Sequence, residues 1–257
     1  MEYFHIHKEE FVADVTFSRP PANALSSAVL KELSSVLDEL EADDQVRVVL
    51  LHGEGRFFSA GADIKEFTSV KSSDEATALS QNGQQVLERI ERFPKPVIAA
   101  IHGAALGGGL ELAMSCHIRI VSENAKLGLP ELQLGIIPGF AGTQRLPRYV
   151  GFGKAAEMMW TSEPITGAEA VQWGLANKAV PEEQLLEEAK KLAQKIAQKS
   201  PISIRATLQL LNSFKEKPFR EAVHEEAMLF GSVFTTEDAK EGVQAFIEKR
   251  PPVFRGK

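Results

Sequence analysis

The sequence predicts an α/β fold followed by a helical C-terminal region. Short apolar runs of strand character alternate with helical patterns from residue 11 to about residue 180, an order that favours a layered α/β domain. After residue 182, four helical patterns follow one another with no strand pattern between them. We therefore expect an α/β core over residues 1–195 and a helical region over residues 196–257.

The composition is that of an ordinary globular protein. Of the 257 residues, 44% are hydrophobic and 25% are charged, values that argue against disorder and against coiled-coil or collagen-like repeats. The formal net charge of −6 gives no basic footprint for nucleic acid or an anionic membrane. Cys116 is the one cysteine, so an intrachain disulfide and a multi-cysteine metal site are both excluded. We expect a cytoplasmic protein without a nucleic-acid or membrane partner.

The first half of the expected core reads as two strands and a helix. Residues 11–17 alternate apolar and other side chains, as in a half-buried strand, and the two prolines at 20 and 21 stop the pattern. Ser26 is a suitable N-cap for a helix whose apolar residues recur at helical spacing up to residue 40. Residues 46–51 form a short, apolar run that predicts a buried strand, and a loop with glycines follows over 53–63.

The second half continues the alternation. A helical pattern over 74–93 is terminated by Pro94 and Pro96, and residues 97–101 read as another buried strand. A glycine-rich segment over 103–109 leads into a predicted helix. Further strands are expected at 118–121 and 126–129, and C-terminal helices at 182–199, 202–215, 219–231 and 236–249.

Several common catalytic and cofactor motifs do not occur in the sequence. Position 112 is Leu, so the glycines at 107–109 do not extend to a dinucleotide-binding G-x-G-x-x-G, and no phosphate-binding G-x-x-x-x-G-K-[ST] occurs. H-E-x-x-H and G-x-S-x-G are also missing, and the histidines show no metal-ligand grouping beyond His5 and His7, which we expect at the surface. We expect neither a metal site nor a nucleotide cofactor.

Two glycine-rich segments, residues 59–65 and 107–111, are candidates for binding an anion. Small residues let another group approach the backbone closely, and a helix N-terminus presents unpaired N–H donors. Two such segments are able to form an oxyanion hole. The simpler alternative is that these glycines only allow tight turns and close helix packing.

Glu111 and Glu131 both lie in apolar local sequence. Burial of a carboxyl group raises its pKa toward values that suit proton transfer. Either residue alone has an ordinary alternative as a solvated charge or a charge near a helix N-terminus. The two residues together favour a catalytic pair more than either residue does alone.

Three blocks of the sequence together resemble the crotonase superfamily, with the best match to enoyl-CoA hydratases. The blocks are SAGADIK at 59–65, GAALGGGLELA at 103–113 and LPELQLGIIPGFAGTQRLP at 129–147. The resemblance extends over nearly the whole chain, including residues 23–25, 166–170 and 245–250. It implies a spiral of repeated ββα units, followed by C-terminal helices that build a homotrimer or a dimer of trimers.

The resemblance also implies a role for each candidate catalytic group. The backbone N–H groups of Ala62 and Gly108 would bind the thioester carbonyl oxygen, Glu111 would activate or orient the attacking water, and Glu131 would deliver a proton to the α-carbon. Isomerase relatives commonly keep only the acid that matches Glu131. The presence of Glu111 therefore favours hydration over double-bond migration.

The resemblance implies that coenzyme A is part of the substrate, and no separate cofactor is expected. Phe246 and Lys249 match positions that, in relatives, reach the CoA of a neighbouring subunit. Two residues depart from the usual pattern: Phe140 replaces a small residue, which would narrow or reshape the acyl pocket, and Ser59 stands where Cys is frequent. The substrate-binding residues implied by the resemblance are Ala24, Leu25, Ala60, Asp63, Ile64, Lys65, Gly139, Phe246 and Lys249.

The function expected from these residues is the reversible syn addition of water to a short or medium 2-enoyl-CoA, a lyase reaction of fatty acid β-oxidation. The nearest alternatives are another acyl-CoA reaction of the same superfamily, namely isomerisation, hydration of a branched or carboxylated enoyl-CoA, or thioester hydrolysis. Alternatives of a different class are a non-catalytic acyl-CoA-binding protein and an RNA-associated relative. The acidic balance disfavours RNA, and the intact pair of glutamates disfavours a protein without catalysis.

Overall fold

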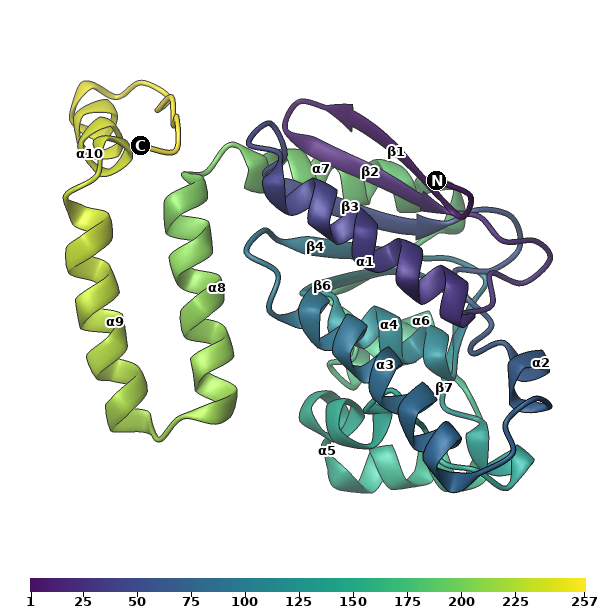
Figure 1. The fold of residues 1–257 in the computed structure, drawn as a ribbon. Helices are drawn as coiled ribbons and strands as arrows, with labels where there is room; N and C mark the ends of the chain where they lie inside the picture. The colour runs from purple at the N-terminus through teal and green to yellow at the C-terminus, as the bar shows by residue number, and fades with distance from the viewer.

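The computed structural model describes residues 1–257 except for the side chain of Lys215. It consists of an α/β core and a helical arm that stands apart from the core (Figure 1). The expectation of alternating strands and helices followed by helices alone is confirmed. The strands are β1 (Phe4–Glu9), β2 (Val12–Phe17), β3 (Val48–Gly53), β4 (Val97–Ile101), β5 (Ala104–Leu106), β6 (Ile118–Ser122), β7 (Lys126–Gly128), β8 (Ile165–Thr166) and β9 (Lys178–Val180).

The helices for which the sequence predicted a range begin and end within a few residues of the predicted positions. Ser26 caps the first helix, because its side chain accepts a hydrogen bond from the N–H of Val29. Thr166 and Glu169 form a reciprocal capping box at the start of α6. The α-helices are α1 (Ser27–Ala42), α2 (Ile64–Phe67), α3 (Ser73–Glu91), α4 (Gly108–Ser115), α5 (Gly142–Thr161), α6 (Gly167–Gln172), α7 (Leu185–Ala197), α8 (Pro201–Glu216), α9 (Phe219–Phe234) and α10 (Glu237–Glu248), and two 3₁₀ helices are η1 (Glu131–Leu134) and η2 (Glu182–Gln184).

The larger sheet has the strand order β1-β2-β3-β4-β6-β9. All its neighbouring pairs are parallel except β1 and β2. Alternate residues of the central strands serve opposite faces: Leu50 and Ile98 pack with α7, whereas Leu51 and Ala99 belong to the core on the other face. Burial of both faces explains why β3 and β4 read as continuous apolar runs instead of alternating ones.

The smaller sheet has the order β5-β7-β8 and is extended by two isolated bridges, Leu25 with Ala62 and Ser59 with Ala105. Successive turns of the chain therefore contribute one segment to the larger sheet and one to the smaller: β3 and the residues at 59–62, then β4 and β5, then β6 and β7. This arrangement is the expected spiral of repeated strand–strand–helix units. It places Ala62 and Gly108 in adjacent turns of the spiral.

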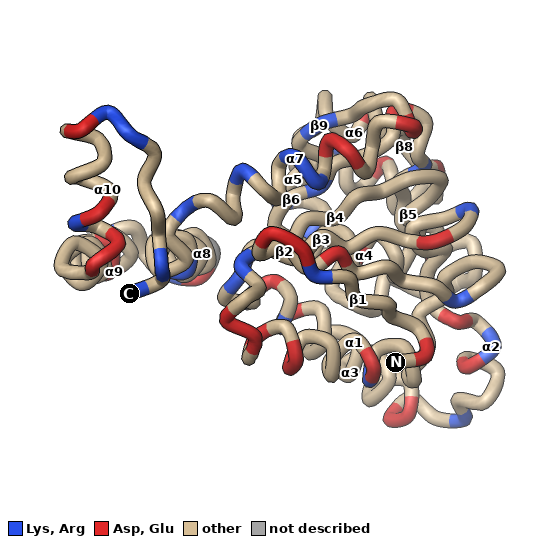
Figure 2. The backbone as a smooth tube through the Cα atoms, turned by 90° about the horizontal axis from the view of Figure 1, so that it is seen from above, with Lys and Arg blue, Asp and Glu red and all other residues tan. Residues whose placement is uncertain are grey.

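Helices α8, α9 and α10 form the arm, in which α8 and α9 run side by side (Figure 1). Large apolar side chains are exposed along this arm, and basic and acidic residues are interspersed over both arm and core (Figure 2). Helix α7 packs on the larger sheet, so the arm begins only after Ala197. The division at 195–196 stays a prediction about folding units. The exposed apolar side chains of the arm include Leu211, Phe214, Phe219, Met228, Phe230, Phe234, Val243, Phe246, Ile247 and Val253.

None of the helices in the described residues is both long enough and apolar enough to cross a membrane.

Candidate active site

A cavity of about 940 Å³ lies between α3, the N-terminus of α4, and the segment from η1 to the start of α5. Seven of the predicted site residues contribute to its wall. They are Ala60, Ala62, Ile64, Gly108, Glu111, Glu131 and Gly139. The structure thus brings together both glutamates and both predicted backbone donors.

The backbone N–H groups of Ala62 and Gly108 are available as donors at this wall. Leu25 bonds to the residues on either side of Ala62: its N–H donates to the Gly61 carbonyl at 2.8 Å, and its carbonyl accepts from the Asp63 N–H at 2.9 Å. Gly108 is the first residue of α4, where an N–H has no partner within the helix. Among the described residues, neither the N–H of Ala62 nor that of Gly108 has an acceptor.

The two donors are close together because glycines let their loops approach. A Cβ atom on Gly108 would lie 3.3 Å from the nitrogen of Ala62. At Gly61 the φ angle is +112°, and a Cβ would lie 2.9 Å from the carbonyl oxygen of Leu106. Glycine is therefore required at position 61 for two reasons: its positive φ angle, and the lack of space for a side chain. Two adjacent backbone donors, one of them at a helix N-terminus, form the geometry of an oxyanion hole.

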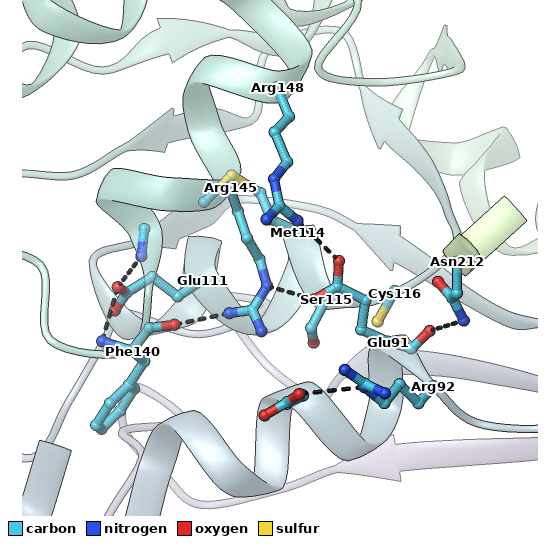
Figure 3. Close-up of polar contacts among 12 residues, drawn as sticks. Glu91, Arg92, Glu111, Met114, Ser115, Cys116, Phe140, Arg145, Arg148 and Asn212 are labelled. Atoms are coloured by element: carbon cyan, nitrogen blue, oxygen red, sulfur yellow. Dashed lines mark hydrogen bonds and ion pairs between the residues drawn. The ribbon is translucent and has the colours of Figure 1, made fainter. Parts of the chain in front are cut away.

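Glu111 lies in the first turn of α4 and is 1% exposed. Its Oε1 atom accepts two backbone hydrogen bonds, from Phe140 N–H at 2.8 Å and from Gly142 N–H at 2.6 Å (Figure 3). Burial, followed by the charge of Glu131, raises the pKa of Glu111 from 4.5 to about 7, although the two N–H groups and Arg145 act in the opposite direction. A carboxyl group with such a pKa is able to exchange a proton near neutral pH.

Glu131 is the first residue of η1 and is half-buried. Its Oε2 atom is buried and has no hydrogen-bond partner in the structure, and burial raises the pKa of the carboxyl group. Oε1 lies against the backbone of Gly107, where a Cβ would be only 2.8 Å away and where φ is +50°. An unpartnered carboxyl oxygen at the wall of a cavity is free to meet a substrate atom.

The two glutamates are electrostatically coupled, since the negative charge of Glu131 disfavours ionisation of Glu111. Glu111 accepts two N–H bonds, which favour its ionised form, whereas Glu131 has no comparable donor on Oε2. Burial nevertheless raises the pKa of both carboxyl groups, that of Glu111 to about 7. Near neutral pH such a pair is able to hold one proton between its two members, which supplies one acid and one base.

Phe140 is buried and forms another part of the cavity wall. Its ring is so close to Gly83 of α3 that a Cβ there would lie 2.2 Å from a ring carbon. On its other edge, the ring lies 3.3 Å from the position of a Cβ on Gly108. Phe140 thus fills the space between α3 and the candidate oxyanion hole, and its role in an acyl pocket stays a prediction.

The remaining predicted substrate-binding residues lie outside this wall. Leu25 is buried beside Ala62, and Ala24 accepts a hydrogen bond from Arg19 through its carbonyl. Asp63 caps α2 and pairs with Arg19 at 2.6 Å, and Lys65 is exposed on α2. Phe246 and Lys249 lie at the end of α10 on the arm, and Phe246 is 85% exposed. Within one chain the structure does not bring these two residues to the cavity.

The sequence did not assign a supporting role to the residues that pack against the two glutamates or hold their turns. Gly107 makes room for Glu131 and Gly142 makes room for Glu111. Ser80 and Gln84 of α3 donate to the carbonyl of Gly139, at 2.5 and 2.9 Å. Gly107 and Gly142 lie inside the quoted motifs, but nothing in the sequence pointed to Ser80 or Gln84, because α3 lies far from residue 139 along the chain. Among the side chains that are described, no group of three His, Cys, Asp or Glu residues is placed to hold a metal ion.

Comparisons with known proteins point in one direction. Residues 7–257 match the family described as enoyl-CoA hydratase/isomerase. A "probable enoyl-CoA hydratase" of Bacillus subtilis is 60% identical over 249 residues, which cover 96% of each chain. A "short-chain-enoyl-CoA hydratase" of Clostridium acetobutylicum is 45% identical, with coverage of 95% of this chain and 94% of that protein. The crystal structure of an enoyl-CoA hydratase from Bacillus anthracis is 38% identical and superposes with a TM-score of 0.94 over 99% of this chain and all of the other.

Proposed function

The chain belongs to the enoyl-CoA hydratase/isomerase family, and we propose that Glu111 and Glu131 together perform its reaction. It is an enoyl-CoA hydratase with the crotonase fold, and it adds water to a 2-enoyl-CoA to give a 3-hydroxyacyl-CoA. The observation that supports the assignment of residues is that one cavity contains both carboxyl groups and both unpartnered backbone donors.

In the proposed mechanism, the ionised Glu111 accepts a proton from water as the water oxygen bonds to C3 of the enoyl group. The C2–C3 π electrons move toward the thioester, and negative charge develops on its carbonyl oxygen. The N–H groups of Ala62 and Gly108 are already oriented, so they stabilise this charge without reorganisation. Loss of one comparable donor in other enzymes costs about 3–4 kcal/mol of transition-state stabilisation.

The protonated Glu131 then donates its proton to C2 and completes the addition. After one turnover, the shared proton has moved from Glu131 to Glu111, and its return restores the starting state. Dehydration follows the same steps in reverse, with Glu131 as the base at C2. No cofactor apart from the substrate's own CoA is part of the proposal.

We propose a 2-enoyl-CoA of short or medium chain as the substrate, in keeping with a reaction of fatty acid β-oxidation. The names of two relatives, a short-chain-enoyl-CoA hydratase and a crotonyl-CoA hydratase, support the shorter end of this range. The backbones of Ala24, Leu25 and Ala60, together with Asp63, Ile64 and Lys65, would contact CoA. Gly139 would lie near the reacting end.

The proposed assembly is a homotrimer or a dimer of trimers. The proposal is supported by the exposed apolar side chains on α8, α9 and α10, because monomeric soluble proteins rarely expose large apolar patches to water. In such an assembly, Phe246 and Lys249 would reach the CoA site of a neighbouring copy. Sedimentation of the purified protein tests this, and a stable monomer at micromolar concentration would contradict it.

A cytoplasmic location, supported by the single cysteine, is proposed as well.

The experiment that tests the function is product analysis with a panel of acyl-CoA esters of different chain length and branching. Crotonyl-CoA should give 3-hydroxybutyryl-CoA, and 3-hydroxybutyryl-CoA should give back crotonyl-CoA. Accumulation of a 3-enoyl product would indicate isomerisation instead, and release of free CoA would indicate thioester hydrolysis.

A further inference from the structure

The turn at residues 139–142 holds the Glu111 carboxylate, and it is a turn that needs external support. Ala141 has a left-handed conformation, with φ +71° and ψ 21°. For a residue with a Cβ this conformation costs roughly 1–2 kcal/mol. Side chains from α3 fix the Gly139 carbonyl on one side of the turn, but they do not reach the Phe140 carbonyl.

Arg145 supports the other side of this turn. Its guanidinium donates through Nη1 to the Phe140 carbonyl at 2.7 Å, and its Nε atom pairs with Oε2 of Glu91 at 3.1 Å (Figure 3). Arg145 is 5% exposed, so these contacts are shielded from solvent. The Phe140 carbonyl lies between the two N–H groups, of Phe140 and Gly142, that donate to Glu111.

We propose that Arg145, held in place by Glu91, is a positioning residue for the Glu111 carboxylate. Arg145 does not contact Glu111 in this arrangement; it fixes the backbone whose N–H groups orient Oε1, and it adds a positive charge behind them. The inference rests on the proposed role of Glu111. It extends the active site to an ion pair between α3 and α5, in which Arg145 is buried and Glu91 is half-buried.

The charges that face Glu111 come from two elements. Glu131 of η1 disfavours the ionised form of Glu111, and Arg145 of α5 favours it. Glu91 lies behind Arg145, and Arg148 pairs with the other oxygen of Glu91 at 3.4 Å from a half-exposed position. Removal of the charge at residue 145 should therefore raise the pKa of Glu111, so that the ionised base forms only at higher pH.

The test compares Arg145→Gln with Arg148→Gln in the intact protein, with crotonyl-CoA as substrate. Arg145→Gln should lower kcat by about 10- to 100-fold, the size expected when a reacting group is displaced by a fraction of an ångström to 1 Å. KM should change by less than about threefold, and the acid limb of the kcat profile should move to higher pH. Arg148→Gln removes a partner of the same Glu91 without touching the turn, so its kcat and pH profile should stay within about twofold of the original.

Two further variants test the role of Arg145 even where Arg145→Gln is hard to interpret alone. Glu91→Gln retains an oxygen that can accept from Arg145 but removes a negative charge behind it. It should lower kcat less than Arg145→Gln does, and the acid limb of the kcat profile should move to lower pH, opposite to its shift in Arg145→Gln. If Arg145→Gln does not fold, a folded Glu91→Gln protein with the original kcat and pH profile would overturn the inference. In a Glu111→Gln background, Arg145→Gln should add little further loss, because its effect passes through Glu111.

A folded Arg145→Gln protein with the original kcat and pH profile would overturn the inference, as would a full additional loss in the Glu111→Gln background. Failure of the proposed role of Glu111 would give a different result, because Glu111→Gln itself would then retain its activity.

Discussion

Oε1 of Glu111 lies 2.6 Å from the backbone nitrogen of Gly142, and a Cβ on Gly142 would lie 2.8 Å from the same oxygen. The hydrogen bond that orients Glu111 therefore depends on the missing side chain at residue 142. A contact below 3.0 Å between a Cβ and an oxygen forces one of the two to move.

Gly142→Ala should displace the Glu111 carboxylate and lower kcat for hydration of crotonyl-CoA by at least about tenfold. The expected change in KM is small, because residue 142 is not among the groups proposed to bind CoA. Gly153→Ala is a matched control, since Gly153 lies in the same helix and a Cβ there meets nothing within 4 Å. Equal kcat values for the two variants would show that the Gly142 contact does not matter for catalysis.

Gly108→Ala tests the proposed oxyanion hole. The added methyl group would lie 3.3 Å from the nitrogen of Ala62, in the region where the thioester oxygen would accept its hydrogen bonds. We expect kcat to fall by about 10²- to 10³-fold, the effect of losing one such donor elsewhere. Steady-state kinetics and thermal unfolding of the same preparation separate this loss from unfolding. A decrease in stability without a decrease in kcat would assign Gly108 to packing alone.

Phe140 and Gly83 should change substrate preference in opposite directions. Phe140→Ala removes the ring between α3 and the oxyanion hole, so it should raise kcat/KM for branched or longer enoyl-CoA esters relative to crotonyl-CoA. Gly83→Ala would place a methyl group 2.2 Å from the present position of a ring carbon. The ring must then move into the cavity, and the preference for crotonyl-CoA should increase. The ratio of kcat/KM values over the acyl-CoA panel is the measurement, and unchanged ratios in both variants would remove Phe140 from the acyl pocket.

The pKa of Glu111 also predicts how stability depends on pH. A carboxyl group whose pKa is raised from 4.5 to about 7 by burial destabilises the folded state as pH rises through this interval. Glu111→Gln removes that penalty, so the variant should unfold less readily at pH 8, by up to about 3 kcal/mol, and show little difference below pH 4.5. Urea unfolding at fixed protein concentration checks this, with Glu183→Gln at an exposed site as the control. A difference that is the same at pH 4.5 and pH 8 would contradict the raised pKa.

Much of the fold can be predicted from the sequence, because local sequence signals determine where many of its helices and strands begin and end. Ser26 begins a helix where an N-cap is expected, and β4 occupies the predicted residues 97–101. The short helix α2 was not predicted, since four residues carry no periodic pattern. Helix α7 reads like the helices of the arm, yet its apolar side packs on the sheet, which only the tertiary structure reveals.

The candidate site divides in the same way. Glu111, Glu131, Ala62 and Gly108 lie in compact motifs, and their resemblance to a known family indicated their roles before the structure placed them around one cavity. The contacts that hold them come from distant parts of the chain. Gln84 reaches the carbonyl of residue 139, and Glu91 holds Arg145. Such contacts depend on how the turns of the spiral stack on one another. The periodicity of a single sequence does not indicate which turns will be neighbours.

The central claim is that two carboxyl groups divide the reaction, with Glu111 acting on water and Glu131 acting at C2. The most direct measurement is kcat for hydration of crotonyl-CoA by Glu111→Gln and Glu131→Gln, each shown to be folded. Each substitution removes one general acid or base, so each should lower kcat by about 10²- to 10⁴-fold. A folded variant of either kind that keeps kcat within about tenfold of the original would contradict the two-carboxylate mechanism.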